Sequence, residues 1–328
     1  MGGCICKPQT AAPWPDLPPE IAGRIFSCLP SHDDRLSFAA VSSRWRIAAR
    51  LQNLLPPPVP CINLDHGRYQ RLVDGEVRRF PAAKSYCAGT SFGGWLFYYH
   101  KGSGRCFLRA PVSGDPIELP TRPLPQSPDY VYTDIAFYDG KVFVLSRWEE
   151  LFCHELFTVG GINHSLIPIV CHDMEAQPAM TTNSYLVVSS DKQKLLMVRW
   201  RRRANQPAID MRVFEADFGK ARWLELKDLG DQLLFLGRSG SMAFAATHTE
   251  YWGPRFRGGN RVFVLGTEWA RSVEQAVYTK RDIPGYCIYD MISGKTSLVS
   301  LGRPRRTKSC TSGWFFPTSE NLYHFKFR

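Results

Sequence analysis

The 328-residue chain lacks the signals of several protein classes. Its ten cysteines are scattered without a Cys-x-x-Cys pair, and no secretory hydrophobic segment lies at the N-terminus. We therefore predict neither disulfides nor secretion, and expect an intracellular protein. No run of about 18 apolar residues occurs, which argues against an ordinary transmembrane helix.

Motifs for metal binding and catalysis are also scarce. Cys153-His154 and Cys171-His172 are the Cys/His clusters beyond residue 60, and neither has the spacing of zinc ligands. Residues 237–240 lack the Lys-Ser/Thr of a phosphate loop, and no Gly-x-Ser-x-Gly elbow occurs. The sequence therefore predicts no metal, no cofactor and no catalytic residue.

The formal net charge is +11, and most of the excess lies in the later part of the chain. Residues 1–55 hold six basic and four acidic residues, which leaves +9 for the remainder. This balance favours acidic partners. Dense basic clusters with interleaved aromatics are missing, so nucleic acid is an unlikely partner.

What the sequence does contain, in residues 14–55, is a pattern of three short helices. Ile21, Ile25 and Leu29 recur at helical spacing before Pro30. Ser31 and Asp34 have the spacing of a capping box for the second helix. The apolar residues of the second and third helices are Leu36, Ala39, Ala40, Val41, Trp45, Ile47, Ala48 and Leu51, with Ser42 or Ser43 as the cap between them. A unit of about 40 residues cannot bury all of these, so we expect a partner.

The order Leu-Pro-x-Glu, Ile, Ile, Leu, then Leu, then Val-Ser-x-x-Trp resembles the F-box, which docks substrate receptors on the Skp-type adaptor of SCF ubiquitin ligases. The resemblance covers the whole motif; Pro19 departs from it, where a polar residue is usual. It implies that Leu17 and Pro18 open the adaptor contact, that Ile21, Ile25 and Leu29 form a buried stripe, and that Val41 and Trp45 form a second cluster. The residues expected to bind the adaptor are Leu17, Pro18, Ile21, Ile25, Leu29, Leu36, Val41 and Trp45.

From residue 61 the helical period gives way to short aromatic and β-branched runs separated by Gly, Asp-Gly and Ser-Gly turns, which is typical of all-β structure. Asp139-Gly140 marks a hairpin in DIAFYDGKVFVLSR. Strand groups recur with a period of roughly 40 to 50 residues, as in propeller blades. Residues 62–80 offer outer strands and 312–327 inner ones, so we predict that both ends build one blade that closes the ring.

We therefore expect an α+β multidomain protein: a small three-helix F-box followed by an all-β, kelch-like propeller of about five or six blades. The predicted boundaries are a disordered tail at 1–13, the F-box at 14–55, a Pro-rich linker at 56–60 and the propeller at 61–328.

A second resemblance covers most of residues 61–317. KDLGDQLLFLGRSGSMAF, PGYCIYDMISGKTSLV and SGWFFP are similar to the plant F-box proteins that carry a KIB-type propeller. Residues 247–260 depart from that pattern as a long excursion in place of a tight turn. The resemblance implies a non-catalytic substrate receptor of an SCF-type ligase, linked through the adaptor to a cullin-RING ligase, with an unknown protein as target.

The sequence leaves two alternative functions open. Propellers host glycosidases, which use paired carboxylates, and Asp134, Asp139 and Asp191 lie near strand ends or turns. Turn chemistry is the more common role of such aspartates. The other alternative is a non-catalytic scaffold that competes for the adaptor.

Signals for location point in two directions. Residues 199–203 form one basic cluster, and Arg303, Arg305, Arg306 and Lys308 form a second that is typical of a nuclear-import signal. Gly2, Cys4 and Cys6 could carry a myristoyl and a palmitoyl chain, which would place the protein at the plasma membrane. Cys6 stands where the myristoylation signal usually has Ser or Thr, so we expect the nucleus and the cytoplasm.

Overall fold

The structure is a computed structural model. It describes residues 14, 17–52, 55–64, 68–80, 87–92, 95–100, 105–109, 117–119, 132–155, 163–167, 180–203, 209–237, 240–265, 285–301 and 313–317. The predicted disordered tail at 1–13 lies outside these residues.

Three helices open the described chain: α1 (Pro19–Ser27), α2 (His32–Val41) and α3 (Ser43–Arg50). Pro19 stands in the first turn of α1, where its missing N–H removes no intrahelical bond. The side chain of Ser42 accepts a hydrogen bond from the Trp45 N–H at 3.2 Å, which confirms the cap predicted for α3. The capping box predicted for α2 is wrong, because the buried Ser31 makes no side-chain cap bond.

The described strands form five sheets, and within each sheet a strand is hydrogen-bonded to the strands named next to it. The first two are β21 (Gly313–Phe315), β1 (Cys61–Leu64), β2 (Arg68–Arg71), β3 (Val77–Arg79); and β4 (Cys87–Phe92), β5 (Trp95–His100), β6 (Arg105–Arg109), β7 (Ile117–Leu119). The third and fourth are β11 (Asn163–Ile167), β10 (Leu151–Glu155), β9 (Lys141–Ser146), β8 (Tyr132–Tyr138); and β12 (Met180–Val188), β13 (Leu195–Arg203), β14 (Ile209–Asp217), β15 (Arg222–Leu226). The fifth is β17 (Met242–Ala245), β16 (Gln232–Leu236), β18 (Arg261–Leu265), β19 (Gly285–Asp290), β20 (Thr296–Ser300).

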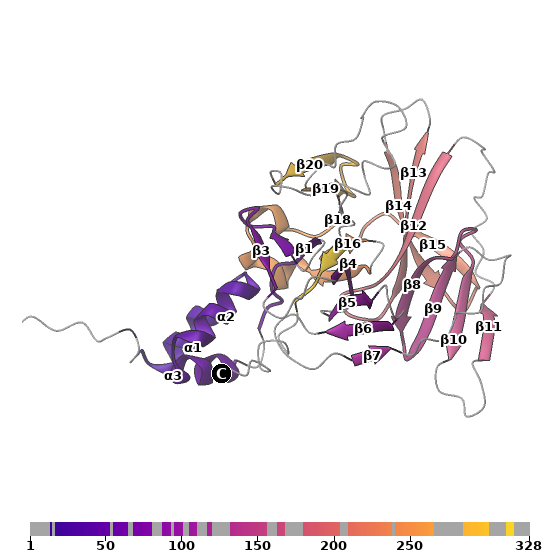
Figure 1. Ribbon diagram of the computed structural model, residues 1–328. Helices are drawn as coiled ribbons and strands as arrows, with labels where there is room; N and C mark the ends of the chain where they lie inside the picture. The colour runs from indigo at the N-terminus through magenta and orange to yellow at the C-terminus, as the bar shows by residue number, and fades with distance from the viewer. Residues whose placement is uncertain are drawn as a thin grey trace, which may run out of the picture.

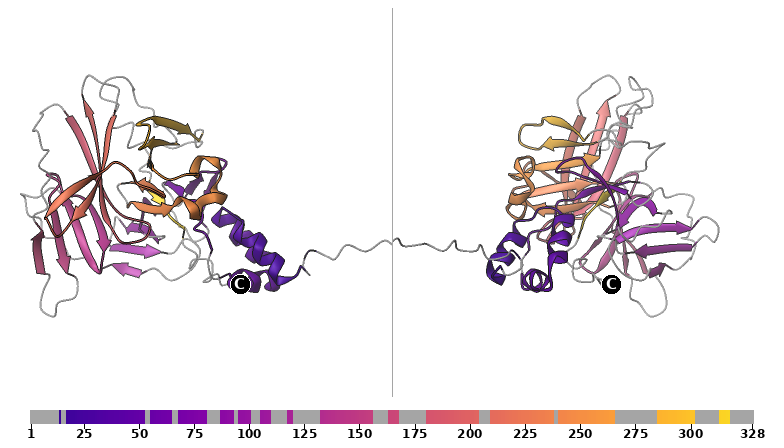
Figure 2. Two further views of the ribbon diagram at one scale, coloured as in Figure 1. Left: turned by 180° about the vertical axis from the view of Figure 1, so that it is seen from behind. Right: turned by 60° about the vertical axis from the view of Figure 1, so that its left-hand side comes forward.

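These sheets are arranged as the blades of a propeller, with the helices outside them beside the first sheet (Figures 1 and 2). The expected fold class, an N-terminal helical unit followed by a β-propeller, is therefore confirmed. The opening strands of the third and fourth sheets, β8 and β12, pack on each other, and β12 also contacts β16 and β17 of the fifth. The first sheet contacts the second through β21 and β4.

The first sheet joins the two ends of the propeller sequence. β1 pairs antiparallel with β21, with Ile62 opposite Trp314. The last described strand of the chain therefore supplies one edge of a sheet whose other strands come from residues 61–79. This pairing confirms the predicted ring closure, and it protects backbone groups that would otherwise form an open edge.

The fifth sheet departs from a simple meander. β18 pairs parallel to β16, while β17 pairs antiparallel on the other side of β16, so the chain must pass around β16 between β17 and β18. Residues 246–260 make this passage through two short 3-10 helices, η3 (Ala246–Trp252) and η4 (Pro254–Phe256). A connection to a parallel strand needs about a dozen residues. This requirement explains why residues 247–260 form a long segment in place of the tight turn that was expected.

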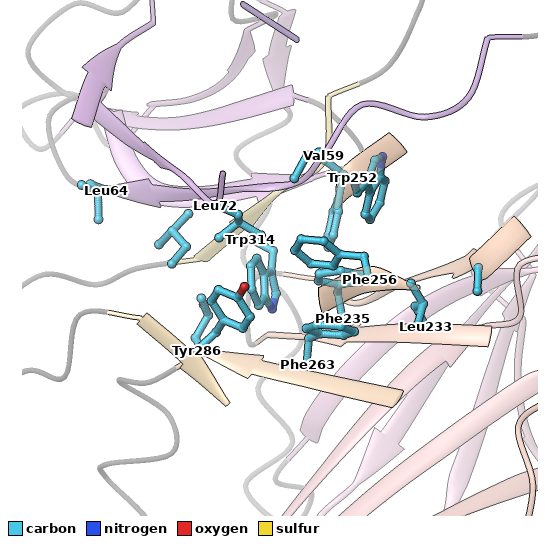
Figure 3. Packing of buried hydrophobic residues seen from close by; sticks show 14 residues of the cluster. Val59, Leu64, Leu72, Leu233, Phe235, Trp252, Phe256, Phe263, Tyr286 and Trp314 are labelled. Atoms are coloured by element: carbon cyan, nitrogen blue, oxygen red, sulfur yellow. The ribbon is translucent and has the colours of Figure 1, made fainter. Parts of the chain in front are cut away.

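A large aromatic cluster joins the fifth sheet to the first (Figure 3). The rings of Phe235 and Phe263 stack with centroids 4.4 Å apart, and Trp314 meets Phe235 edge-on at 5.2 Å. Trp252 and Phe256, from η3 and η4, lie in the same cluster beside Val59 (Figure 3). The excursion therefore adds buried aromatic surface where the two ends of the propeller meet.

Candidate functional site

The three helices have a small internal core. It contains Ala22, Phe26, Phe38, Trp45, Ala48 and Ala49. The rings of Phe38 and Trp45 lie 4.4 Å apart, and Phe26 lies 5.2 Å from Phe38. The small residues at positions 22, 48 and 49 let the helix backbones approach closely. This core is what holds the unit together.

Several large apolar side chains of the same unit face outward. Ile21 and Ile25 are 45% and 36% exposed, one helical turn apart on α1. Ile47 and Leu51, which are likewise four residues apart, are 56% and 63% exposed. α1 and α3 pack against each other. This exposure of aliphatic surface confirms the expectation that the unit cannot bury all its apolar residues by itself, and it is typical of a protein-binding surface.

The residues predicted to contact an adaptor fall into three groups by exposure. Pro18, Ile21, Ile25 and Val41 are exposed; Leu17, Leu29 and Leu36 are partly buried against the core; Trp45 is buried. Adaptor binding by these residues stays a prediction.

Two expectations about these residues need correction. Ile21 and Ile25 are not a buried stripe, because α1 buries a different face, the one with Ala22 and Phe26. Trp45 packs inside the unit and offers little surface.

Polar contacts fix this unit to the first sheet. Asp33, in the first turn of α2, accepts a 2.5 Å hydrogen bond from the Tyr69 hydroxyl and forms a 3.5 Å ion pair with Arg78. Asp34 forms a second ion pair, also at 3.5 Å, with Arg71. Tyr69 is buried, and burial together with the hydrogen bond to Asp33 raises the pKa of its hydroxyl. Two consecutive carboxylates therefore hold the start of α2 against β2 and β3.

The linker adds backbone contacts to this junction. The Val59 N–H donates to the Pro30 carbonyl at 2.8 Å, which ties the linker to the end of the α1–α2 connection. The Trp252 indole N–H donates to the Pro57 carbonyl at 2.7 Å. The Pro-rich segment is thus bound both to the α1–α2 connection and to η3 of the fifth sheet, which fixes its position.

His32 lies at the same junction, beside a small cavity lined by residues of α2, the linker and the first sheet. Burial, with the nearby positive charge of Arg35, lowers the pKa of the imidazole to about 4. The side chain is therefore neutral near pH 7. Arg35 is itself buried and donates from Nε to the Leu29 carbonyl at 2.8 Å.

The three aspartates considered for catalysis serve local structure. Asp134 accepts bonds from the N–H groups of Ile135 and Leu186, which joins the third and fourth sheets. Asp139 has a positive φ of 47° in the predicted hairpin turn. Asp191 accepts from the Ser189 hydroxyl and the Gln193 N–H. The carboxylates of Asp134 and Asp191 thus bind nearby backbone and hydroxyl groups, and Asp139 forms part of the hairpin turn.

Of the residues considered for location, the structure describes the first basic cluster, residues 199–203. In the first basic cluster, Arg199 and Trp200 are buried residues of β13, 1% and 3% exposed. The second cluster (Arg303, Arg305, Arg306, Lys308), the acylation residues (Gly2, Cys4, Cys6) and Cys171-His172 lie outside the described residues. Cys153 and His154 are strand residues of β10. No helix in the described part of the chain is long and apolar enough to cross a membrane.

Sequence reasoning missed the residues of the junction. Asp33 and Tyr69 are 36 positions apart, and Trp252 and Pro57 are 195 apart, so no local pattern could pair them. A weak signal did exist. Asp33-Asp34 at the start of a helix, together with the basic residues of β2 and β3, offered complementary charges, and the aromatic content of residues 247–260 suggested burial.

Comparison with known protein families agrees with this description. The family model F-box-like matches residues 14–54, which hold the three helices and the exposed aliphatic pairs. The family model KIB1-4 beta-propeller matches residues 124–290, about half of the chain. A search of the curated proteins found no match. The chain is therefore an F-box protein that belongs to the KIB1-4 β-propeller family.

Proposed function

We propose that this protein is the substrate-recognition subunit of an SCF-type E3 ubiquitin ligase. Its F-box would dock on a Skp-type adaptor, and its propeller would bind the target protein. The observation that carries the proposal is the exposed aliphatic surface of α1 and α3 on a unit whose own core is already filled. F-box domains generally bind Skp-type adaptors, and an F-box joined to a propeller is typical of non-catalytic receptor subunits.

The fixed junction supports a mechanism by proximity. Asp33, Asp34 and the linker hold the F-box against the first sheet, so the propeller would keep a set position relative to the adaptor and the ligase. A captured target would then present its lysines to the ubiquitin-loaded enzyme at high effective concentration. The receptor itself would supply no catalytic group.

Adaptor binding by purified proteins tests the proposal. Ile21→Lys combined with Ile25→Lys places two charges on the exposed face of α1 and leaves the core residues Ala22 and Phe26 in place. Loss of two interface anchors should weaken binding by about 100-fold or more. Ile292→Lys, at a position 68% exposed in the propeller, is the matched control and should bind normally.

Leu17→Ala with Pro18→Ala tests the opening of the motif, where we expect the same loss. Circular dichroism checks that each variant keeps its fold. Adaptor binding of wild-type strength by the Ile21/Ile25 variant, with the helices intact, would contradict the proposal.

A further inference from the structure

The turn between β9 and β10 presents a large aromatic side chain to solvent. Trp148 is 55% exposed, and the guanidinium carbon of Arg147 lies 5.6 Å from the centre of its ring. Tryptophan and arginine are among the residue types most enriched in the energetic centres of protein interfaces. The contacts that hold this turn therefore decide how Trp148 is presented to a partner.

The turn is held by a dense set of hydrogen bonds to one buried residue, Ser146. Its hydroxyl oxygen accepts from the N–H groups of Trp148 and Glu150, both at 3.1 Å. Its backbone N–H donates to the Glu150 carbonyl at 2.9 Å, and its carbonyl accepts from the Glu149 N–H at 3.0 Å. The backbone on either side of Trp148 is therefore fixed.

Glu149 anchors the same turn in the neighbouring sheet. Its backbone has a φ of +63°, an unfavourable value for a residue other than glycine, and its side chain is 2% exposed. The carboxylate accepts from the Ser184 hydroxyl at 3.0 Å and forms an ion pair with the buried Arg199 at 3.3 Å. Its carbonyl accepts from the Trp223 indole N–H at 3.0 Å.

Ser184, Arg199 and Trp223 lie in β12, β13 and β15. Three strands of the fourth sheet therefore hold the β9–β10 turn of the third sheet. Strained backbone persists only where surrounding contacts impose it, and it is concentrated at functional positions. A rigid turn also loses little conformational entropy when a partner binds to it. Trp148 is thus presented as a preorganised contact.

The most exposed charge beside Trp148 is positive, that of Arg147. Within the described residues no carboxylate forms an ion pair with Arg147. The buried Glu149 forms its ion pair with Arg199, and the half-buried Glu150 accepts from the Ser146 hydroxyl at 3.1 Å, so Arg147 is the most exposed charged residue of the turn. The later part of the chain carries the excess of basic residues, so its long-range field also favours an acidic partner.

We propose that Arg147 and Trp148 form an anchor for an acidic segment of the target protein. Trp148 would cover an apolar side chain of that segment, and Arg147 would pair with a neighbouring carboxylate. This inference rests on the proposed function, because it assigns the propeller to target recognition.

A displayed library of random peptides, selected against the full-length chain, tests the anchor. We expect the selected peptides to combine Asp or Glu with an aromatic or aliphatic residue. The best peptide is then synthesised and its affinity measured. Trp148→Ala should weaken its binding by about tenfold or more. Arg147→Glu should weaken binding of the acidic peptide. It should have less effect on the binding of a peptide in which Asn and Gln replace the acidic residues.

Tyr251→Ala is the matched control, because Tyr251 is also an aromatic residue, 52% exposed, on η3. It should leave peptide affinity unchanged. Selected peptides without acids, or equal affinity for wild type and Trp148→Ala, would overturn the anchor. Dimerisation of wild type that Trp148→Ala abolishes would also overturn it, since the turn would then bind a second copy. Adaptor affinity, measured on the same proteins, judges the proposed function separately.

Discussion

Trp314→Ala removes the side chain that holds the closing strand of the propeller. The indole is 1% exposed, packs edge-on against Phe235 with centroids 5.2 Å apart, and donates from Nε1 to the Leu236 carbonyl at 2.8 Å. Truncating a buried tryptophan costs about 3 to 5 kcal/mol of folding free energy. Leaving the Leu236 carbonyl unpaired adds about 1 kcal/mol. The expected loss, about 4 to 6 kcal/mol, is a large part of a domain's total stability of about 5 to 15 kcal/mol.

Urea unfolding followed by circular dichroism and tryptophan fluorescence measures this loss. Trp314→Phe keeps an aromatic ring beside Phe235 but cannot donate to Leu236, so it should cost less than the alanine variant. Trp148→Ala, an exposed site, should change stability by no more than about 0.5 kcal/mol. An unfolding midpoint of Trp314→Ala equal to that of wild type would refute the account of ring closure.

Three further predictions concern closure, pH and location. Deleting residues 309–328 removes β21 and opens the edge of β1, so the truncated chain should aggregate; a soluble monomer with unchanged melting, by size exclusion and calorimetry, would contradict this. Because burial lowers the pKa of His32 from 6.5 to about 4, the unfolded chain takes up a proton that the folded chain does not as pH falls through this range. The free energy of unfolding should then fall by up to about 3 kcal/mol as the pH is lowered. Urea titrations between pH 7 and 5 should show a smaller fall for His32→Phe than for wild type. A C-terminally tagged chain should be nuclear and cytosolic, and membrane fluorescence that Gly2→Ala abolishes would show instead that the N-terminus is acylated.

The strands of the propeller could be predicted because their signals are local. The hairpin at Asp139-Gly140 forms, with Tyr138 paired to Lys141. The short apolar runs of residues 233–301 form the strands of the fifth sheet, but the order of these strands in the sheet could not be predicted. The position of β17 and the parallel pairing of β16 with β18 depend on the packing of Trp252 and Phe256, which only the folded chain brings together.

The faces of the F-box helices were harder to predict than the helices themselves. α1 carries apolar residues on both sides, and spacing alone could not show that Phe26 faces the core while Ile21 and Ile25 face solvent. The junction and the buried pair of Glu149 and Arg199 escaped prediction for another reason. An acidic residue or an arginine is normally exposed, and its burial depends on partners far away in the sequence.

The most direct test of the account compares ubiquitination by wild type and by the Ile21/Ile25 lysine variant in cells. Affinity purification with mass spectrometry identifies the proteins bound to each, and ubiquitin-remnant profiling measures their modification. The account predicts that both forms retain the same targets through the propeller, while only wild type co-purifies with the adaptor and raises target ubiquitination. Equal ubiquitination of those targets by the two forms, or the absence of adaptor from wild-type purifications, would contradict it.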